Sequence, residues 1–245
     1  AAGVSKKGKR NSRQTGAYQL CDYNIFLTKE DKELFAQLYG ASDTTKVVGG
    51  CFMRKGEQLD INALKPFNER RLKAVISGTI GNVQNLDGIN YFLNELYPCV
   101  PKDMDVVIAG KNPPAELIER LKRFGNIELI ANPKDMDAVL RDCDIYLCPT
   151  RLGGGMKLRV MDGLRNGLPV IAHKVSARGY GEFEKKGILI KFNTEEQFAQ
   201  AIIQATTAIK EKYFSKRYIV EQSSIISFEY NLNVLKEIFN ICFVR

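Results

Sequence analysis

Short hydrophobic runs alternate with amphipathic segments along most of the chain from residue 72 onward. The runs are almost continuously apolar, which is typical of strands that are covered on both faces of a sheet. The segments between them carry apolar positions at helical spacing. This alternation predicts βαβ units and an α/β fold with a doubly wound, mostly parallel sheet. The predicted strands are 72–77, 105–110, 126–130, 145–149, 169–173 and 187–192.

The chain before residue 72 gives a shorter pattern. A strand signal at 22–28 is followed by a helix that Thr28 can cap, with Asp31 three residues later, and that ends at Gly40. A short strand at 45–50 follows. Residues 51–71 show no clear period and are interpreted as a connector, whereas the segment after residue 193 predicts two or three helices, the last over about 228–243.

The composition favours an ordinary globular protein. Of 245 residues, 44% are hydrophobic and 26% are charged. No run of 18 apolar residues and no signal-peptide pattern occurs in the sequence, so no membrane span is predicted and a cytoplasmic location is expected. The six cysteines include no CxxC pair and the chain has one histidine, which argues against a zinc site and for reduced thiols.

The net charge of +8 is concentrated at one end of the chain. Residues 1–16 contain five basic residues and no acidic residue, so the other 229 residues carry only +3. Such a segment has little apolar mass and is expected to be disordered. A solvated linker is the favoured interpretation, and contact with an anionic membrane surface, which would place the protein peripherally on the inner face, is the second. Nucleic-acid binding is disfavoured because no recognition motif follows.

A glycine triplet, Gly153–Gly155, links the predicted strand 145–149 to an amphipathic helix that carries Lys157, Arg159 and Asp162. A glycine turn that leads into a helix N-terminus exposes backbone N–H groups, and the helix dipole favours negative charge there. The sequence therefore predicts a phosphate site at this turn, with Lys157 as the cation beside it. Arg159 is expected at the surface or as the i,i+3 partner of Asp162.

The order of strand, GTIGNVQNLDGINYFLNELYP, strand-AG, strand and PTRLGGGMKLRVMDGLRNGLPVIAH resembles the donor-binding, C-terminal half of glycosyltransferase family 4. The pair Gln84-Asn85 and the GGG-x-K turn are similar to capsule and exopolysaccharide sugar transferases. The resemblance spans about residues 72–192 and implies one Rossmann-like half of the two-domain GT-B architecture.

The resemblance also implies a role for each matching position. Gly78, Thr79, Gly153, Gly154, Gly155, Met156 and Lys157 would hold the diphosphate of a nucleotide sugar, and Asp162 would bind the ribose. Ile130, Ala131 and Asn132 would border the nucleobase, and Asn85 and Arg178 would lie on the sugar side. The resemblance implies independence from a metal ion, and no cofactor is expected, because the nucleoside-diphosphate sugar is a donor substrate.

The chain departs from the family pattern in two places. The first acidic position of the family's Glu-x7-Glu pattern falls on Gly154, and the first turn lacks the Arg and Lys pair that is common in the wider family. No catalytic residue is therefore assigned.

The domain organisation that follows is 1–16 as a basic tail, 17–71 as a remnant of the acceptor-binding domain with a linker, 72–227 as the nucleotide-sugar-binding domain, and 228–245 as a helix that packs back toward the N-terminal part. Because 245 residues do not supply a second Rossmann-like domain, the chain is expected to be a fragment or to pair with another polypeptide.

The predicted function is a hexosyltransferase, in which this donor-binding half transfers a hexose from a nucleoside-diphosphate sugar to a glycan or a lipid-linked acceptor. Retention of configuration is implied by the resemblance. A non-catalytic GT-B-like module that binds a nucleotide sugar or a partner is the main alternative. A sugar-nucleotide epimerase shares the fold but needs catalytic groups in both halves. A dinucleotide oxidoreductase is disfavoured because the first turn is SGTIGNVQ rather than GxGxxG.

Overall fold

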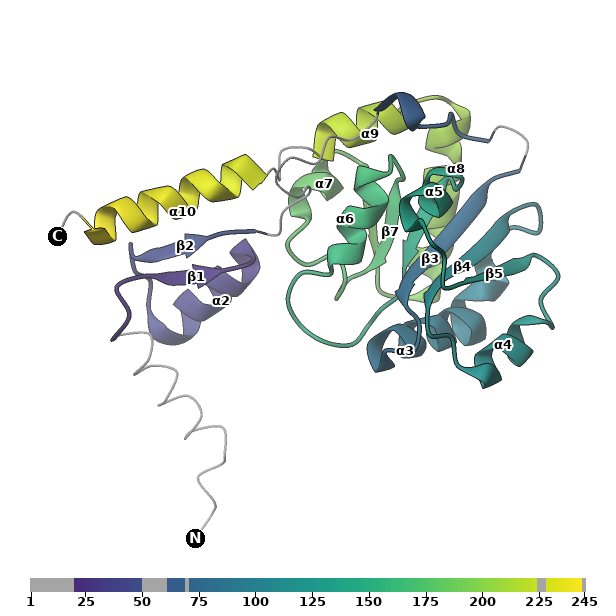
Figure 1. Ribbon diagram of the computed structural model, residues 1–245, viewed down its shortest axis with the longest axis horizontal. Coiled ribbons are helices and arrows are strands. Elements are labelled where there is room, and N and C mark those ends of the chain that lie inside the picture. Colours follow the sequence, from purple (N-terminus) through teal and green to yellow (C-terminus); the bar gives the residue numbers. More distant parts are fainter. Residues whose placement is uncertain (1–19, 50–60, 69–70, 224–227, 244–245) are drawn as a thin grey trace, which may run out of the picture.

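The structure, a computed structural model, describes residues 20–49, 61–68, 71–223 and 228–243. The basic tail 1–16 and much of the predicted connector lie outside these residues. Within them the chain forms a large α/β unit and a smaller unit built from both ends of the sequence (Figure 1).

A six-stranded sheet is the centre of the large unit. Its strand order is β5-β4-β3-β6-β7-β8, and every neighbouring pair is parallel. The predicted doubly wound parallel sheet is thus confirmed, and each of the six predicted strands is present. The strands are β3 (Lys73–Thr79), β4 (Asp105–Lys111), β5 (Ile127–Ala131), β6 (Ile145–Cys148), β7 (Val170–His173) and β8 (Leu189–Phe192).

Helices cover both faces of this sheet, which explains why its strands are apolar without alternation. One face packs against α3 (Val83–Tyr91), its π-helical continuation η2 (Phe92–Leu96), α4 (Ala115–Leu121) and α8 (Glu195–Lys210). The other packs against α5 (Met136–Arg141), α6 (Leu158–Arg165), α7 (Gly181–Lys185) and α9 (Lys216–Ser223). Neighbouring strand residues divide between the two cores: Ile76 belongs to the first and Val75 to the second.

Two details differ from the predicted elements. The first helix after β3 changes to π-helical geometry at Phe92, so that its predicted span of 86–96 is split between α3 and η2. Helix α7 was not predicted, because its five residues are too short to show a helical period.

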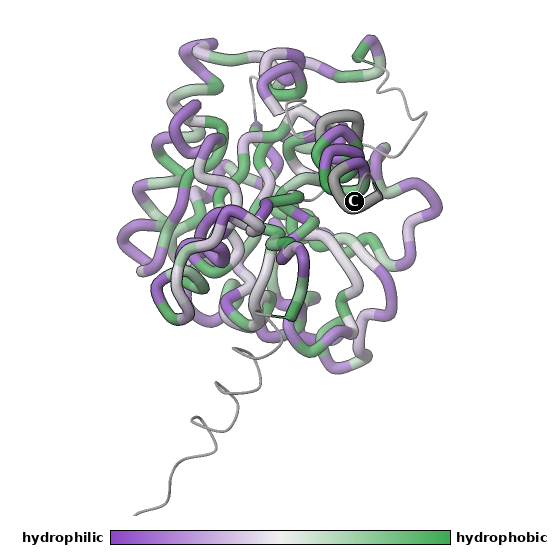
Figure 2. The backbone as a smooth tube through the Cα atoms, turned by 90° about the vertical axis from the view of Figure 1, so that its left-hand side faces the viewer, coloured by the Kyte–Doolittle hydropathy of each residue, from purple (hydrophilic) through white to green (hydrophobic). Residues whose placement is uncertain are grey.

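The small unit contains β1 (Asn24–Phe26), α2 (Lys29–Tyr39) and β2 (Thr45–Val47), and β1 and β2 form a parallel pair. Thr28 caps α2 as predicted: its Oγ1 accepts a hydrogen bond from the Asp31 N–H at 2.9 Å. The C-terminal helix α10 (Phe228–Phe243) lies beside this pair of strands, and Asn231 Nδ2 donates to the Gly49 carbonyl at 2.8 Å (Figure 1). Figure 2 views the molecule from this side, with α10 almost end-on and hydrophobic and hydrophilic positions alternating along it.

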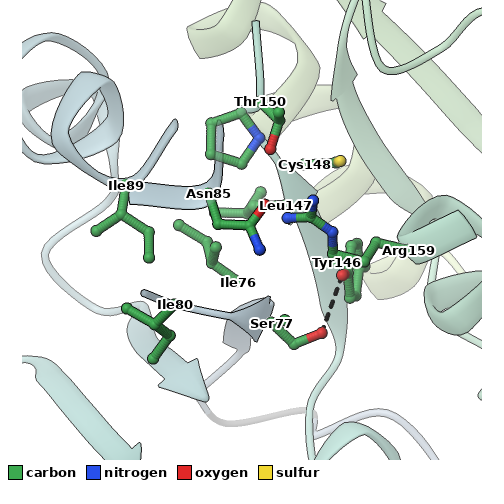
Figure 3. Close-up of a pocket in the computed structure, with 12 residues that line it drawn as sticks. Ile76, Ser77, Ile80, Asn85, Ile89, Tyr146, Leu147, Cys148, Thr150 and Arg159 are labelled. Carbon is green, nitrogen blue, oxygen red and sulfur yellow. Dashed lines mark hydrogen bonds between the residues drawn. The ribbon is translucent and has the colours of Figure 1, made fainter. Parts of the chain in front are cut away.

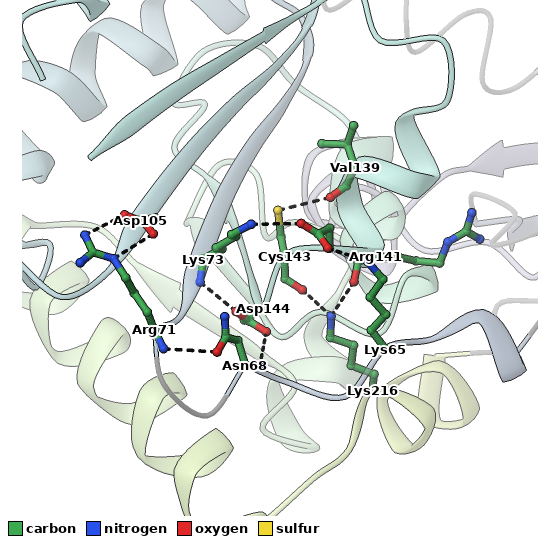
Figure 4. A network of polar contacts seen from close by, with 11 residues as sticks. Lys65, Asn68, Arg71, Lys73, Asp105, Val139, Arg141, Cys143, Asp144 and Lys216 are labelled. Atoms are coloured by element: carbon green, nitrogen blue, oxygen red, sulfur yellow. Dashed lines mark hydrogen bonds and ion pairs between the residues drawn. The ribbon is translucent and has the colours of Figure 1, made fainter. Parts of the chain in front are cut away.

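A buried polar network ties the connector and α9 to the amino-terminal end of the sheet (Figure 4). Asp144 accepts hydrogen bonds from the N–H groups of Asn68 and Lys73 at 2.9 and 2.8 Å. The Lys216 ammonium donates to the carbonyls of Arg141 and Cys143. Burial lowers the pKa of Lys216 and raises that of Asp144. The network therefore fixes both chain segments that lead away from the sheet, at the end opposite the predicted ligand site.

In the part of the chain that the structure describes, no helix is long and apolar enough to cross a membrane.

The close approach of β3 and β4 can be tested by a substitution at Gly110. A Cβ atom at this position would lie 1.8 Å from the Gly78 carbonyl oxygen, which cannot move away without breaking the strand pairing. We expect Gly110→Ala to lower the free energy of unfolding by about 3 kcal/mol or more, measured by urea denaturation. Gly125→Ala is the matched control, because its Cβ would meet nothing within 4 Å; its effect should stay within about 0.5 kcal/mol. Equal destabilisation by both would contradict the close approach.

Candidate functional site

The strand order reverses between β3 and β6, which are neighbours in the sheet although 65 residues (80–144) separate the end of β3 from the start of β6. Their paired positions are Ala74 with Ile145 and Val75 with Tyr146. The connection after β3 leads toward β4 and the one after β6 leads toward β7, so the two connections separate at the carboxyl edge. A crevice at such a point is where ligands bind in open α/β sheets. Residues from the ends of both strands, α3 and α6 line a small cavity there (Figure 3).

Polar groups surround this cavity, whose volume is about 10 Å³. Ser77 Oγ and Tyr146 Oη share a hydrogen bond of 2.9 Å at its floor. The Asn85 amide donates through Nδ2 to the Thr79 carbonyl at 2.6 Å, and its Oδ1 has no hydrogen-bond partner among the described residues. The space is enough for about one water molecule. A larger ligand must therefore contact these groups from the mouth of the cavity.

Arg159 is the residue whose place differs from the sequence interpretation. Its side chain does not extend over the outer surface of α6 but reaches across to the end of β3. Its Cδ and Nη1 lie 2.9 and 3.3 Å from the position that a Cβ would take at Gly78. The Asn85 amide nitrogen lies 3.2 Å from the same position, so Arg159 and Asn85 both lie against Gly78. Figure 3 shows the side chains of Arg159 and Asn85 close together.

The glycine triplet forms an irregular loop between β6 and α6. Gly153 and Gly155 have φ angles of 87° and 68°, in the left-handed region that favours glycine. Gly154 is exposed, has no positive φ, and has nothing within 4 Å of its Cβ position. Two glycines of the triplet are therefore required by the backbone, and the middle one is not.

Lys157 directly precedes α6 and folds back over this loop. Its side chain is buried, its Nζ lies 2.8 Å from the Cβ position of Gly153, and it donates to Gln84 Oε1 at 3.1 Å. Burial lowers the pKa of Lys157, and the positive charge of Arg159 lowers it further. Neither Lys157 nor Arg159 forms an ion pair with a carboxylate among the residues that the structure describes. The two cations thus lie close enough to repel each other, and Asp162 on the same helix is near enough to Arg159 to interact with it electrostatically but not to form an ion pair.

Met156 and Arg178 lie toward the small unit. Met156 Cγ and the Thr28 methyl carbon each lie 2.8 Å from the Cβ position of Gly179. Arg178, predicted on the sugar side, forms an ion pair with Asp31 of α2. The Gly179 N–H also donates to Glu30 Oε1 at 3.3 Å. The loop after β7 is therefore packed between the glycine loop and the small unit.

The remaining predicted residues lie at the same edge of the sheet. Asp162 is partly buried on α6, and burial raises the pKa of its carboxyl group. Ile130 and Ala131 end β5, and Asn132 follows with its Oδ1 accepting from the Asn112 N–H at 3.0 Å. Ala131 and Asn132 are exposed at the end of β5, and Lys111 and Asn112 are exposed at the end of β4.

His173 ends β7 but is held as a structural side chain. It is 7% exposed, and its ring makes edge contacts with Tyr91 and Phe192 at centroid distances of 6.2 and 5.6 Å. Its Nδ1 accepts from the Val175 N–H at 3.3 Å, and burial lowers its pKa. Within the described residues no group of three or more His, Cys, Asp or Glu side chains is placed to hold a metal ion.

The chemistry that these groups support is anion binding. Two cations without acidic partners, an irregular glycine loop and the start of a helix with no acidic residue in its first turn lie together at the crevice. Sequence reasoning missed Arg159 because its spacing to Asp162 also fits a surface pair. The signal that could have identified it is Gly78, whose lack of a side chain leaves room for the guanidinium.

Solved structures with a similar fold were compared with the chain. HepE from Anabaena, solved in complex with UDP, has a TM-score of 0.63 at 15% identity over 99% of this chain and 70% of its own. Sucrose-phosphate synthase from Thermosynechococcus elongatus has a TM-score of 0.64 at 12% identity, over 99% of this chain and 64% of its own. WaaG, a glycosyltransferase involved in lipopolysaccharide biosynthesis, has a TM-score of 0.55 at 14% identity, over 91% and 68%. These similarities establish the fold, the Rossmann-like half of a GT-B protein.

A search of curated protein sequences finds no match to the chain. The profile of the family described as Glycosyl transferases group 1 matches residues 74–207, which is more than half of the chain and includes all six strands of the large sheet except the first residue of β3. The chain therefore belongs to the glycosyl transferases of group 1.

Proposed function

We propose that this chain is the donor-binding half of a hexosyltransferase whose donor is a nucleoside-diphosphate hexose. The observation that carries the proposal is the pair Lys157 and Arg159, held without acidic partners beside the glycine loop at the crevice. Burying unpaired cations is unfavourable unless an anion joins them. A diphosphate offers the charge and the acceptor oxygens that such a pair can bind.

The roles of the other residues follow from the same placement. The N–H groups of Gly153–Gly155 and Met156 would bind the phosphates together with Gly78 and Thr79. Asp162 would accept hydrogen bonds from the ribose, and Ile130, Ala131 and Asn132 would border the base. Asn85 would face the sugar through its unpartnered Oδ1. The ion pair of Arg178 with Asp31 supports a role at the junction of the two units rather than direct contact with the sugar.

Transfer would be accelerated chiefly by stabilising the departing diphosphate, since negative charge develops on it as the bond to the sugar breaks. Retention of configuration and independence from a metal ion belong to the same proposal. The Anabaena HepE structures contain UDP, glucose and UDP-glucose, which makes uridine nucleotides the first donors to test.

A second cavity supports a place for the acceptor. It has a volume of about 540 Å³ and lies where α2 and β2 meet the loop before α7, with Met156 in its wall. Glu30, Glu33 and Glu182 also line it. Carboxylates accept hydrogen bonds from hydroxyl groups, so a glycan or lipid-linked sugar is the proposed acceptor. A cytoplasmic protein with membrane contact through residues 1–16 remains part of this proposal.

A non-catalytic module that binds a nucleotide sugar or a partner is the second candidate. The observation that favours it is Gly154, which stands at a position where the family resemblance implies a carboxylate. Donor affinity without any transfer, even when a complementary N-terminal half is supplied, would decide for the module.

The donor proposal is tested by titrating the chain with a panel of nucleoside diphosphates and their sugars in a calorimeter. We expect at least one uridine or other nucleoside-diphosphate sugar to bind more tightly than about 1 mM, the range in which glycosyl donors and other substrates commonly bind. If no member of the panel does so, the donor site is wrongly assigned.

Removing either cation should weaken binding of the diphosphate selectively. We expect Lys157→Ala and Arg159→Ala each to weaken UDP by about 10- to 100-fold, because each loses hydrogen bonds between charged groups. Uridine, which lacks the phosphates, should bind nearly as before. Lys122→Ala is the matched control, since Lys122 is exposed and pairs with Glu119 on α4. An equal loss for UDP and uridine contradicts the assigned role.

The glycine triplet provides an internal control for the loop. Gly155→Ala must place a side chain at a φ of 68°, which costs about 1–2 kcal/mol, and we expect UDP affinity to fall about tenfold as the loop changes shape. Gly154→Ala should leave both UDP affinity and stability nearly unchanged, because its backbone is unstrained and its surroundings are open. A larger loss of UDP affinity in Gly154→Ala than in Gly155→Ala would contradict the idea that the loop binds UDP through N–H groups in this conformation.

The affinity for UDP should also depend on pH on the alkaline side. Because burial lowers the pKa of Lys157 below its usual 10.5, the free protein loses this charge at a lower pH than an exposed lysine does. A bound diphosphate favours the charged form, so affinity should be constant at neutral pH and fall as pH rises through the lowered pKa. Lys157→Arg should move this fall to higher pH or abolish it. An unchanged profile in Lys157→Arg would show that another group is responsible.

A further inference from the structure

One face of α3 lies along the whole glycine loop. Gln84, Asp87, Gly88 and Tyr91 are spaced i, i+3, i+4 and i+7 and therefore share this face. Each of the four contacts one of the two ends of the loop, and the five residues 152–156 span the distance between these ends. The helix thus fixes both ends of the segment whose N–H groups are the candidate anion ligands.

Arg151 anchors the first end of the loop. Its Nε donates to Asp87 Oδ2 at 3.2 Å, its guanidinium carbon lies 4.5 Å from the centre of the Tyr91 ring, and Nη1 is 3.8 Å from Glu95 Oε1. The preceding residue, Thr150, is also held in place. Its backbone lies 3.1 Å from the Cβ position of Gly88, and its carbonyl accepts a hydrogen bond from Ser176 Oγ at 2.5 Å.

Lys157 anchors the second end. Its Nζ donates to Gln84 Oε1 at 3.1 Å, one turn before Asp87 on the same helix face. Its carbonyl accepts from the buried Tyr180 hydroxyl at 2.9 Å. Between the anchors, Leu152, Gly153 and Gly154 are exposed, whereas Met156 packs against Gly179.

The two anchors differ in charge balance. Arg151 lies between two carboxylates and on an aromatic ring, so its charge is compensated within the protein. Lys157 has only the neutral amide of Gln84. A positive charge that is already paired adds little to the binding energy of an incoming anion. The planar guanidinium of Arg151 and its stacking on Tyr91 instead restrict the backbone of residue 151. Arg151 is thus suited to hold the loop and Lys157 to bind the ligand.

We propose that Arg151 is a positioning residue that clamps the first end of the glycine loop to α3 and so holds the N–H groups of 153–155 in the ligand-binding arrangement before the ligand arrives. The identity of that ligand, a nucleoside diphosphate, rests on the proposed function above. Ordering the loop in advance removes the entropic cost that binding would otherwise include.

The clamp is tested first without any ligand, by amide hydrogen exchange of residues 152–156. We expect Arg151→Ala, which removes the ion pairs and the cation–π contact, to speed this exchange by about 3- to 10-fold. Asp87→Asn removes only the ion pair with Asp87 and should speed the exchange less. The double variant should exchange no faster than Arg151→Ala. Arg151→Lys keeps the charge but not the planar fork, and should be intermediate. Arg217→Ala is the control, because Arg217 forms an exposed ion pair with Glu221 on α9, away from the loop.

The second measurement is UDP affinity as a function of salt. Arg151→Ala should weaken UDP about 3- to 10-fold and leave the salt dependence of the unmodified chain unchanged, whereas Lys157→Ala should reduce that dependence because a ligand-contacting charge is lost. Thermal unfolding of each variant shows whether the large unit is still folded. If Arg151→Ala unfolds the large unit, the same measurements are made on Asp87→Asn and Arg151→Lys instead.

Unchanged loop exchange in Arg151→Ala and Asp87→Asn overturns the clamp. A fall in salt dependence equal to that of Lys157→Ala overturns it too, because Arg151 would then contact the ligand directly. If the unmodified chain binds no nucleoside diphosphate, the proposed function fails but the exchange result still decides the clamp. The two proposals can therefore fail separately.

Discussion

The reversal of strand order between β3 and β6 is the constraint on which the site depends. Because the connections after these two strands run in opposite directions, no helix crosses the carboxyl edge between them. The start of α3 and the approach to α6 can therefore face each other across the crevice, and Arg159 of α6 can reach the end of β3 at Gly78. Groups from segments 70 to 80 residues apart in sequence meet at this point only because the sheet is wound in both directions.

Electrostatics determines what this crevice can bind. Charged side chains are common on the surface of the large unit, and most of those near the site are paired, as Arg151 is with Asp87 and Arg165 with Asp137. Lys157 and Arg159 differ, since the described residues place no carboxylate against them, and the buried Lys157 has a lowered pKa. A charge arrangement of this kind raises the free energy of the empty site and lowers that of the site with an anion. The pair Lys157 and Arg159 therefore explains both the unfavourable electrostatic energy of the empty site and its expected selectivity for anions.

Much of the fold could be predicted from the sequence, because it depends on local signals. The apolar runs gave all six strands of the sheet, and Thr28 identified the start of α2. The site was less predictable where the sequence spacing of a side chain was compatible with two different contacts. Arg159 has the spacing of a helix-surface partner of Asp162, and only the tertiary position of Gly78 shows the space that it occupies. Arg178 pairs with Asp31, 147 residues earlier in the chain, and no local pattern encodes such a contact. Arg151 likewise gave no signal, because its partners are set by the way α3 packs against Thr150.

Gly154 bears most directly on whether the proposed donor site would support transfer or binding alone. A glycine that the backbone requires would be explained by conformation alone, as Gly153 and Gly155 are. Gly154 has no positive φ and no atom within 4 Å of its Cβ position, so an acidic side chain would fit there without strain. Sterics therefore do not account for the missing carboxylate that the family resemblance implies at this position. Under the proposed function, Lys157 and Arg159 would stabilise the leaving group, whereas no acid stands at residue 154 to act on the sugar. The two parts of the site would then have separate requirements. A group that acts on the sugar would have to come from elsewhere, such as Asn85 or the small unit across the crevice.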